Sequence, residues 1–335
     1  MKKKNRNSIF VILLALFLLL ISGCGKESTT SNAANESIEN KAPSQEENSK
    51  PKVAVVLKGI DQEYFKLAEQ GAKQAFEDFG VEGIFLAAPT QTDTEKLINI
   101  LEDTLNKEPD ALVVMPSTEA VIPVLEKYNE KDIPVLLIDT DLNWDGKTTY
   151  IGTDNYTAGK EAGEFLASKL SEGDEIAILE GVSGATVSED RVRGVEDVMK
   201  EKGIKIAASQ AADFDRVKAV TVMENILTAN PNIKGVFAAN DEMAMGALKA
   251  ITSRNMNIPI IGIDGTTDAL ESIGKGHLTA TVAQKPYDMA YLGVENALKA
   301  INGDTVEKNI TSPISVVTEE NALSLLEEVK SILGK

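Results

Sequence analysis

The stretch of sequence that decides the fold spans residues 235–268 and reads GVFAANDEMAMGALKAI, then a short loop, then IPIIGIDGTTD. Each half begins with a short apolar run, at residues 236–239 and 258–263. Apolar runs of this length, bounded by Gly, Pro, Asn and Asp, are typical of strands buried on both faces of a parallel sheet. Between the two runs, apolar residues recur at helical spacing: Met243, Ala247, Leu248 and Ile251. The segment therefore predicts a strand, a helix and a second strand.

Polar side chains follow both predicted strands. Asn240 and Asp241 come after the first strand, and Asp264 comes after the second. The carboxyl ends of parallel strands meet at one edge of the sheet, where open α/β folds bind ligands. A purely local alternative is that Asp241 caps the helix and Asp264 turns the chain. Two such strand ends, together with Arg191, favour a ligand site.

Short apolar runs and helical periodicities alternate along the chain from residue 52 onward. Predicted strands lie at residues 52–57, 83–87, 111–115, 133–138, 175–179, 204–209, 236–239, 258–263, 280–283 and 314–317. Predicted helices lie at residues 67–79, 97–105, 120–128, 155–170, 191–202, 217–228, 243–251, 289–301 and 323–333. This alternation predicts strand–helix–strand units with right-handed crossovers.

The second half of the chain repeats the pattern of the first. The segment IPVLLIDTD in the first half corresponds to IPIIGIDGTTD in the second. A chain of 335 residues also exceeds what one core comfortably supports. We therefore expect an α/β protein with two similar lobes, each a doubly wound parallel sheet, and one further strand–helix unit in each lobe.

The chain is predicted to cross between these lobes three times. The expected N-terminal lobe takes residues 52–153 and 285–311, and the expected C-terminal lobe takes residues 154–284 and 312–335. Candidate hinge residues lie at the three crossovers: Thr153, Asp154, Lys285 and Ser312.

The N-terminal segment, residues 1–23, has the pattern of a signal peptide. Basic residues precede an apolar run at residues 9–21, which is too short for a comfortable membrane span. The sequence Ile-Ser-Gly-Cys then resembles the bacterial lipoprotein signal, in which cleavage precedes the cysteine and its sulfur is lipidated. Cys24 is the only cysteine of the chain. An ordinary secretory signal and a single anchor helix are the alternatives.

Residues 24–51 are rich in Ser, Asn, Glu, Thr and Lys and nearly free of large apolar residues. Such a segment cannot bury enough surface to fold, so we expect a flexible tether. Removal of residues 1–23 would change the formal net charge from −18 to −22, because they carry three Lys and one Arg. An acidic chain of this kind disfavours nucleic-acid binding.

Several side chains at or near predicted strand ends have the chemistry of a ligand site. Carboxylates accept hydrogen bonds from hydroxyl groups, a guanidinium donates through a planar fork, and aromatic faces suit the apolar face of a sugar ring. This set predicts a polyhydroxylated neutral ligand: Tyr64, Phe65, Asp139, Arg191, Phe214, Asn240, Asp264 and Gln284. Each residue also has an alternative role without a ligand. Arg191 could lie on the surface of a helix, Phe214 could belong to the core, and Asn240 could cap a helix.

Four segments carry a resemblance to a known family. ASQAADFDR, VFAANDEMAMGALKA, GIDGT and TATVAQ are similar to the bacterial periplasmic ribose-binding proteins and their allose-binding relatives. These proteins are monosaccharide receptors of ABC transporters with a type I periplasmic-binding fold. The resemblance implies sugar contacts at Asp139, Arg191, Phe214, Asn240, Asp264 and Gln284. It also implies ring contacts at Tyr64 and Phe65 and a hinge residue at Thr153.

The chain departs from the ribose-binding pattern at three positions. Thr140 stands where ribose binders carry a second arginine, Gln62 replaces an asparagine, and Lys58 replaces a small serine. A lysine after VVL is similar to the allose-type members. Lys58 and Gln62 are both included among the predicted ligand contacts. Lys58 could lie either in the pocket or on its rim. Ribose, allose, a ketohexose and another small sugar all stay open.

The predicted function is an extracytoplasmic, lipid-anchored sugar receptor of an ABC importer. The resemblance implies a monomer that works with a permease and an ATPase on separate chains, without cofactor or metal. A sensory receptor that delivers a sugar-like signal to the membrane is the alternative. An enzyme is disfavoured because the chain lacks P-loop, GxGxxG, HExxH and GxSxG motifs. Sugar-responsive repressors share this fold but begin with a helix-turn-helix. Here a signal sequence and an acidic tether occupy that position, so a DNA-binding regulator is disfavoured.

Overall fold

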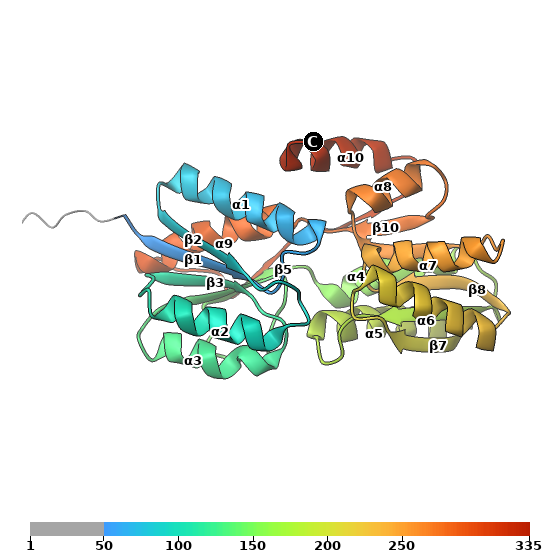
Figure 1. Cartoon of the computed structure of the whole chain (residues 1–335), viewed down its shortest axis with the longest axis horizontal. Coiled ribbons are helices and arrows are strands. Elements are labelled where there is room, and N and C mark those ends of the chain that lie inside the picture. Colours follow the sequence, from blue (N-terminus) through green and yellow to red (C-terminus); the bar gives the residue numbers. More distant parts are fainter. Residues whose placement is uncertain (1–49) are drawn as a thin grey trace, which may run out of the picture. The chain divides into compact units, whose positions relative to one another are not determined.

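The computed structural model describes residues 50–335 (Figure 1). The predicted signal peptide, Cys24 and nearly all of the predicted tether lie outside the described residues. Within residues 50–335, no helix combines the length and the apolar character needed to cross a membrane.

The first lobe is built on a six-stranded sheet in the order β11-β5-β4-β3-β1-β2. Every pair in this sheet is parallel. Its strands are β1 (Lys52–Leu57), β2 (Glu82–Ala87), β3 (Ala111–Met115), β4 (Val135–Ile138), β5 (Thr149–Gly152) and β11 (Asn309–Thr311). The 3-10 turn η1 (Glu119–Val121) precedes α3 in the connection from β3 to β4.

Helices cover both faces of this sheet, which explains why its strands are apolar almost throughout. Val53 and Val55 of β1 pack with α1 (Glu63–Phe79) and α9 (Pro286–Ile301). Ala54 and Val56 face the other way, toward α2 (Thr94–Leu105) and α3 (Ile122–Asn129). The strand alternation thus produces one core on each side of the sheet.

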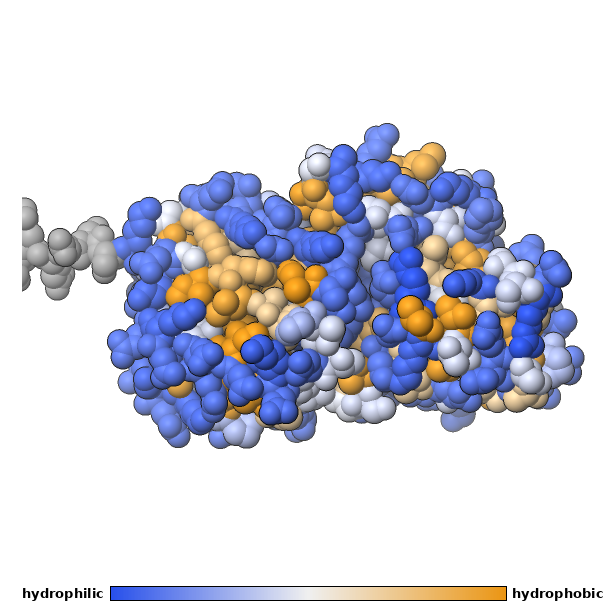
Figure 2. Space-filling model, in the orientation of Figure 1, coloured by the Kyte–Doolittle hydropathy of each residue, from blue (hydrophilic) through white to orange (hydrophobic). Residues whose placement is uncertain are grey.

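The edge strand β2 is less well covered than the other strands of the sheet. Apolar residues gather between α1 and α2 on the face that Figure 2 shows, where Ile84, Phe85 and Leu86 are half-buried. The ammonium of Lys73 lies 5.8 Å from the centre of the Phe85 ring. A charge at this position disfavours edge-to-edge pairing with another strand.

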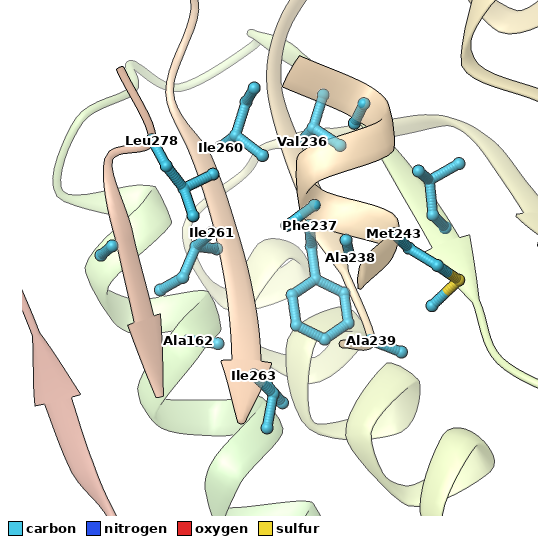
Figure 3. Close-up of a cluster of buried hydrophobic side chains, with 14 of the residues drawn as sticks. Ala162, Val236, Phe237, Ala238, Ala239, Met243, Ile260, Ile261, Ile263 and Leu278 are labelled. Carbon is cyan, nitrogen blue, oxygen red and sulfur yellow. The ribbon is translucent and has the colours of Figure 1, made fainter. Parts of the chain in front are cut away.

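The second lobe is built on a six-stranded sheet in the order β12-β10-β9-β8-β6-β7. Its strands are β6 (Glu175–Glu180), β7 (Lys205–Ala211), β8 (Ile233–Ala238), β9 (Ile260–Asp264), β10 (Ala280–Ala283) and β12 (Ser315–Val317). Its helices are α4 (Asn155–Ala167), α5 (Thr186–Glu201), α6 (Arg216–Ala229), α7 (Asp241–Ser253), α8 (Thr267–Gly274) and α10 (Ala322–Leu333). Figure 3 shows part of its core, where apolar side chains of β8 and β9 pack with Met243 and Ala162.

The predicted two-lobed α/β architecture is confirmed, with some differences in its elements. β12 runs antiparallel to β10, so the second sheet is not wholly parallel. The sequence did not locate β5, β11 or α8, which are only four, three and eight residues long. α5 begins at Thr186 and not at residue 191, because its first turn is polar and carries little apolar periodicity.

The chain passes from one sheet to the other in three short segments. These lie between β5 and α4, between β10 and α9, and between β11 and β12. The carboxyl ends of the parallel strands in both sheets lead into these segments and into the loops beside them. Polar side chains at those strand ends from both lobes are therefore brought together.

Candidate ligand-binding site

A cavity lies between the two lobes and encloses about 300 Å³ of space outside the atoms, counting its mouth. This volume is at the small end of the range for small-molecule sites. The first lobe contributes Lys58, Gln62, Tyr64, Phe65, Gln91 and Asp139 to its lining. The second lobe contributes Val187, Arg191, Phe214, Asn240, Asp264 and Gln284.

All ten side chains that the sequence predicts as ligand contacts line this one cavity, and their contact with a ligand stays a prediction. Two lining residues were not predicted. Gln91 lies in the polar segment after β2, and its place beyond a strand end is the sequence signal that marks it. Val187 is an apolar residue in the first turn of α5, and the sequence contains no signal that marks it.

Asp139 follows β4 and is held by three donors. Its Oδ2 atom accepts hydrogen bonds from Lys58 Nζ at 2.6 Å and from Thr140 Oγ1 at 2.8 Å. Its Oδ1 atom accepts one from the Tyr64 hydroxyl at 2.6 Å. Burial raises the pKa of Asp139, but Lys58 and Tyr64 outweigh it and hold that pKa below its ordinary value. Asp139 is therefore a fixed, ionised acceptor at neutral pH.

The structure decides between the two positions left open for Lys58. Its side chain is buried and points at Asp139 and Thr140, so it lies inside the cavity and not on the rim. Tyr64 does more than present its ring to a ligand, because its hydroxyl donates a hydrogen bond to Asp139. The Tyr64 ring meets Phe65 edge to face, with 5.8 Å between ring centres. Burial raises the pKa of Tyr64 well above its ordinary value, which keeps the hydroxyl a donor.

Arg191 is a buried guanidinium and not a surface residue of its helix. Its Nε atom donates to Asn155 Oδ1 at 2.8 Å, and its Nη1 atom donates to the Ala239 carbonyl at 2.7 Å. Nη1 also lies 3.9 Å from Asp264 Oδ1. These contacts fix the plane of the guanidinium at the edge of the cavity. Asn155, at the start of α4, is a positioning residue that no sequence pattern indicates.

Asp264 and Asp241 form a second acidic centre in which the two carboxylates have different tasks. Asp264 lines the cavity and accepts a hydrogen bond from Gln284 Nε2 at 2.8 Å. Asp241 is fully buried behind it and accepts from the backbone N–H groups of Gly265 at 2.8 Å and Thr266 at 2.9 Å. Asp241 therefore holds the turn that presents Asp264.

The local alternative, in which Asp241 caps its helix, is wrong. The N-cap of α7 is Asn240, whose Oδ1 atom accepts from the backbone N–H of Met243 at 2.9 Å. Asn240 lines the cavity as well, so both of its predicted roles are compatible. Asp241 is the first residue of α7, and its side chain turns toward β9 and β10 because four donors meet there.

The two buried carboxylates perturb each other. Burial raises the pKa of Asp241 to about 6, against the effect of its hydrogen-bond donors. Burial also raises the pKa of Asp264, and the nearby charge of Asp241 adds to this rise while Arg191 opposes it. Like charges at close range disfavour double ionisation. This centre is therefore sensitive to pH, unlike Asp139.

Three cavity residues have positive φ angles: 64° at Asp139, 58° at Phe214 and 136° at Asp264. Non-glycine residues in such conformations each cost on the order of 1–3 kcal/mol and cluster at ligand sites. The Phe214 ring lies directly over Gly181, where an added Cβ would approach ring carbon Cζ to 2.0 Å. Backbone strain and the missing side chain at Gly181 together set the place of this ring.

Contacts between the lobes surround the cavity. Gln62 Nε2 donates to the Phe214 carbonyl at 2.9 Å, and Thr186 Oγ1 donates to the Asp141 carbonyl at 2.9 Å. Glu63 accepts two hydrogen bonds from Thr267. In each of these contacts, one partner belongs to the first lobe and the other belongs to the second lobe. The lobes therefore meet around the cavity.

The site combines fixed acceptors, fixed donors and amides that can do both. Asp139 is paired with Lys58, and Asp264 lies near Arg191, an arrangement that suits a neutral ligand with several hydroxyl groups. Phe65 and Phe214 add aromatic surface. Among residues 50–335, no three His, Cys, Asp or Glu side chains are grouped so as to hold a metal ion.

Comparison with known proteins now places the chain. A family model described as a periplasmic binding protein domain matches residues 53–305. The chain belongs to the periplasmic binding protein family. This result confirms the resemblance drawn from the sequence, and the two α/β lobes are the architecture that the periplasmic-binding fold implies.

Two relatives show where the chain lies within the periplasmic binding protein family. It is 34% identical over 314 residues to the ribose import binding protein of Bacillus subtilis (strain 168), covering 92% of this chain and 98% of that protein. It is 33% identical over 255 residues to the D-allose-binding periplasmic protein of Escherichia coli (strain K12), covering 72% and 82%. The similarity is thus to the ribose- and allose-binding members.

Solved structures of other periplasmic binding proteins have the same fold. An ABC transporter periplasmic solute binding protein from Actinobacillus succinogenes 130z, with bound D-allose, superposes with a TM-score of 0.78 at 33% identity, covering 82% of this chain and all of that one. A carbohydrate transporter solute binding protein from Agrobacterium radiobacter, in complex with D-arabinose, gives 0.79 at 29% identity, covering 85% and 99%.

Proposed function

We propose that this protein is the substrate-binding component of an ABC sugar importer and captures a monosaccharide of the ribose or allose kind. The observation that carries the proposal is the small cavity between the lobes. Two buried carboxylates, two buried cations and two phenyl rings converge on it from both lobes. The names of the ribose- and allose-binding relatives support the same ligand class.

Capture proceeds by closure of the lobes, without chemistry on the sugar. The lobes rotate about the three crossovers, with hinge residues Thr153, Asp154, Lys285 and Ser312, and the sugar is buried between them. The lobe boundaries at 153/154, 284/285 and 311/312 fall between strands of different sheets, which supports this division. A closed cleft then presents a surface formed by both lobes to a permease.

Lys58 and Thr140 set the choice of sugar. Lys58 donates to both Asp139 and Thr140, so the carboxylate of Asp139 is oriented by a cation and not by a second arginine. Replacement of a planar guanidinium by an ammonium changes which pairs of hydroxyl groups the site can bind. The binding experiment below therefore compares D-allose and D-ribose directly.

No enzymatic step is assigned to the cavity. Its carboxylates and cations are engaged in holding one another, and the lone histidine, His277, is exposed and outside the lining. The permease and its ATPase are separate chains, and the protein acts as a monomer. Its proposed place is the outer face of the cell membrane, anchored through a lipid on Cys24, without nucleic acid as a partner.

Isothermal titration calorimetry with D-allose, D-ribose, D-arabinose and a panel of ketohexoses tests the proposal. We expect saturable heat with at least one of them and protection of the protein against thermal unfolding by the same sugar. Asp264→Ala, which removes one acceptor of the cavity, should abolish the heat. Absence of heat and of protection for every sugar would overturn the proposed function. Turnover of a sugar, followed by mass spectrometry, would overturn the non-enzymatic assignment.

A further inference from the structure

Helix α8 (Thr267–Gly274) does not cap its own N-terminus. Its N-cap residue, Thr266, makes no side-chain hydrogen bond to the first turn, because its hydroxyl donates to Asp241. The first N–H groups of a helix lack partners within the helix and require an acceptor from elsewhere. Helix α8 therefore begins with an unfilled capping position.

Glu63, from the other lobe, supplies the missing acceptor. Its Oε1 atom accepts from the Thr267 backbone N–H at 2.7 Å, and its Oε2 atom accepts from the Thr267 hydroxyl at 2.7 Å. Glu63 is the first residue of α1 in the first lobe, and Thr267 is the first residue of α8 in the second. A carboxylate at a helix N-terminus also interacts favourably with the helix dipole. The cap is thus made across the junction between the lobes.

The C-terminal residue completes this cluster. Lys335 Nζ lies 2.8 Å from Glu63 Oε2, and it follows α10, the helix that lies next to α8 in Figure 1. Burial acts to raise the pKa of Glu63, but Lys335 and Thr267 together lower it below its ordinary value. Both partners of Glu63, Thr267 and Lys335, belong to the second lobe.

Glu63 occupies this position without lining the cavity. Its neighbours Gln62 and Tyr64 both line the cavity, whereas its own side chain points to α8. The cross-lobe cap therefore depends on how the lobes are placed and not on a contact with the ligand. Rotation of the lobes away from each other would separate Glu63 from Thr267 and leave α8 uncapped.

We propose that Glu63 is an interlobe latch, a residue that caps helix α8 only when the lobes are closed and so sets the affinity for the ligand. The proposal rests on the proposed function, since it concerns closure around a captured sugar. Affinity depends on the fraction of molecules in the binding-competent state, so an interaction made only in the closed state strengthens binding without touching the ligand.

Substitutions at both ends of the contact test the latch in the full chain. With D-allose and D-ribose as probes, Glu63→Ala should weaken the affinity about tenfold to a hundredfold, which equals about 1.4–2.8 kcal/mol. Glu63→Gln, which keeps one oxygen acceptor, and Thr267→Val, which keeps the backbone N–H, should each lose less. The loss should lie in a faster dissociation rate, because loss of the latch leaves the population of the open state, which meets the sugar, no smaller than in the wild type.

Glu77→Ala is the matched control, because it removes a carboxylate from the exposed far end of the same helix. It should leave the affinity unchanged. Small-angle X-ray scattering of the ligand-free protein gives a reading that does not depend on any sugar. The radius of gyration of Glu63→Ala should exceed that of the wild type, and that of Glu77→Ala should match it.

The outcomes separate the latch from the proposed function. If the wild type binds none of the sugars while Glu63→Ala is more open, the function fails and the latch stands. If Glu63→Ala binds a sugar as tightly as the wild type and scatters identically, the latch is wrong and the function stands. If Glu63→Ala does not fold, Glu63→Gln and Thr267→Val decide, and wild-type affinity in both overturns the latch.

Discussion

Lys58 Nζ lies 2.6 Å from Asp139 Oδ2, and neither side chain is more than 7% exposed. Two oppositely charged groups buried at this distance depend on each other, because either one alone would be an unpaired charge away from water. Lys58 is thus as important for keeping Asp139 ionised and oriented as for any contact with a ligand.

Lys58→Met should lower the free energy of unfolding of the ligand-free protein by about 3 kcal/mol, since it leaves the Asp139 carboxylate buried without its cation. Urea denaturation at pH 7 measures this loss. Lys58→Met combined with Asp139→Leu should recover most of the stability while still failing to bind sugar. Lys73→Met, which breaks the exposed pair with Glu69, should cost less than about 1 kcal/mol. A Lys58→Met variant as stable as the Lys73→Met variant would contradict this account of the pair.

Asn155→Ala should weaken sugar binding about tenfold, or about 1.4 kcal/mol, without direct contact with the sugar. The reason is that Asn155 Oδ1 accepts the hydrogen bond from Arg191 Nε and so holds the guanidinium plane. Asn155→Asp keeps an acceptor at this place and should retain most of the affinity. Calorimetry on both variants measures the difference. Equal affinities for the alanine and aspartate variants would remove the positioning role.

Much of the site could be predicted from the sequence because strand ends are visible in it. Asp139, Asn240, Asp264 and Gln284 each follow a short apolar run, and parallel strands carry their ends to one edge. Arg191 and Phe214 lie on a helix and in a loop, so periodicity alone could not place them. The chemistry of their side chains made them candidates, and the family resemblance supported both.

Other features depend on contacts that a local pattern does not contain. Asn240 and Asp241 are adjacent and chemically similar, and which of them caps α7 depends on the donors that β9 and β10 bring to Asp241. Glu63 looks like an ordinary first-turn acid of α1, and its partner Thr267 is 204 residues away. β11 has three residues and is a strand only because β5 lies beside it.

Gly181→Ala should weaken sugar binding at least tenfold by displacing the Phe214 ring. An added Cβ would lie 2.0 Å from Phe214 Cζ, so the ring must leave its position in the cavity wall. Calorimetry with the preferred sugar measures the loss. Gly235→Ala is the control, because the nearest atoms to its added Cβ would be side-chain carbons of Leu166, Leu170 and Ile176, at 3.2–3.3 Å and away from the cavity. Wild-type affinity in Gly181→Ala would show that the ring position is not critical.

The paired carboxylates Asp241 and Asp264 should make the ligand-free protein less stable as the pH rises. Each has a pKa raised by burial in the folded state, so the folded state binds more protons than the unfolded state above the ordinary pKa of Asp. The share of Asp241 is therefore complete below about pH 4 and is lost as the pH rises through about 6, its raised pKa. The share of Asp264 is lost as the pH rises through its own raised pKa. Asp139 has a lowered pKa, so its contribution to stability is lost as the pH falls, and only below its ordinary pKa of 3.8.

Asp264→Asn tests this assignment, because it keeps the shape of the side chain and removes one of the two charges. The slope of unfolding free energy against pH between about 4 and 7 should become flatter than in the wild type, since the remaining carboxylate of Asp241 loses its like-charged neighbour. Urea denaturation at four pH values across this window measures the slope. Asp145→Asn, at an exposed position, should leave it unchanged. The same Asp264→Asn variant should bind sugar at least tenfold more weakly, because the amide replaces one of the two carboxylate acceptors in the cavity. A slope equal to that of the wild type would show that the buried pair does not control the pH dependence.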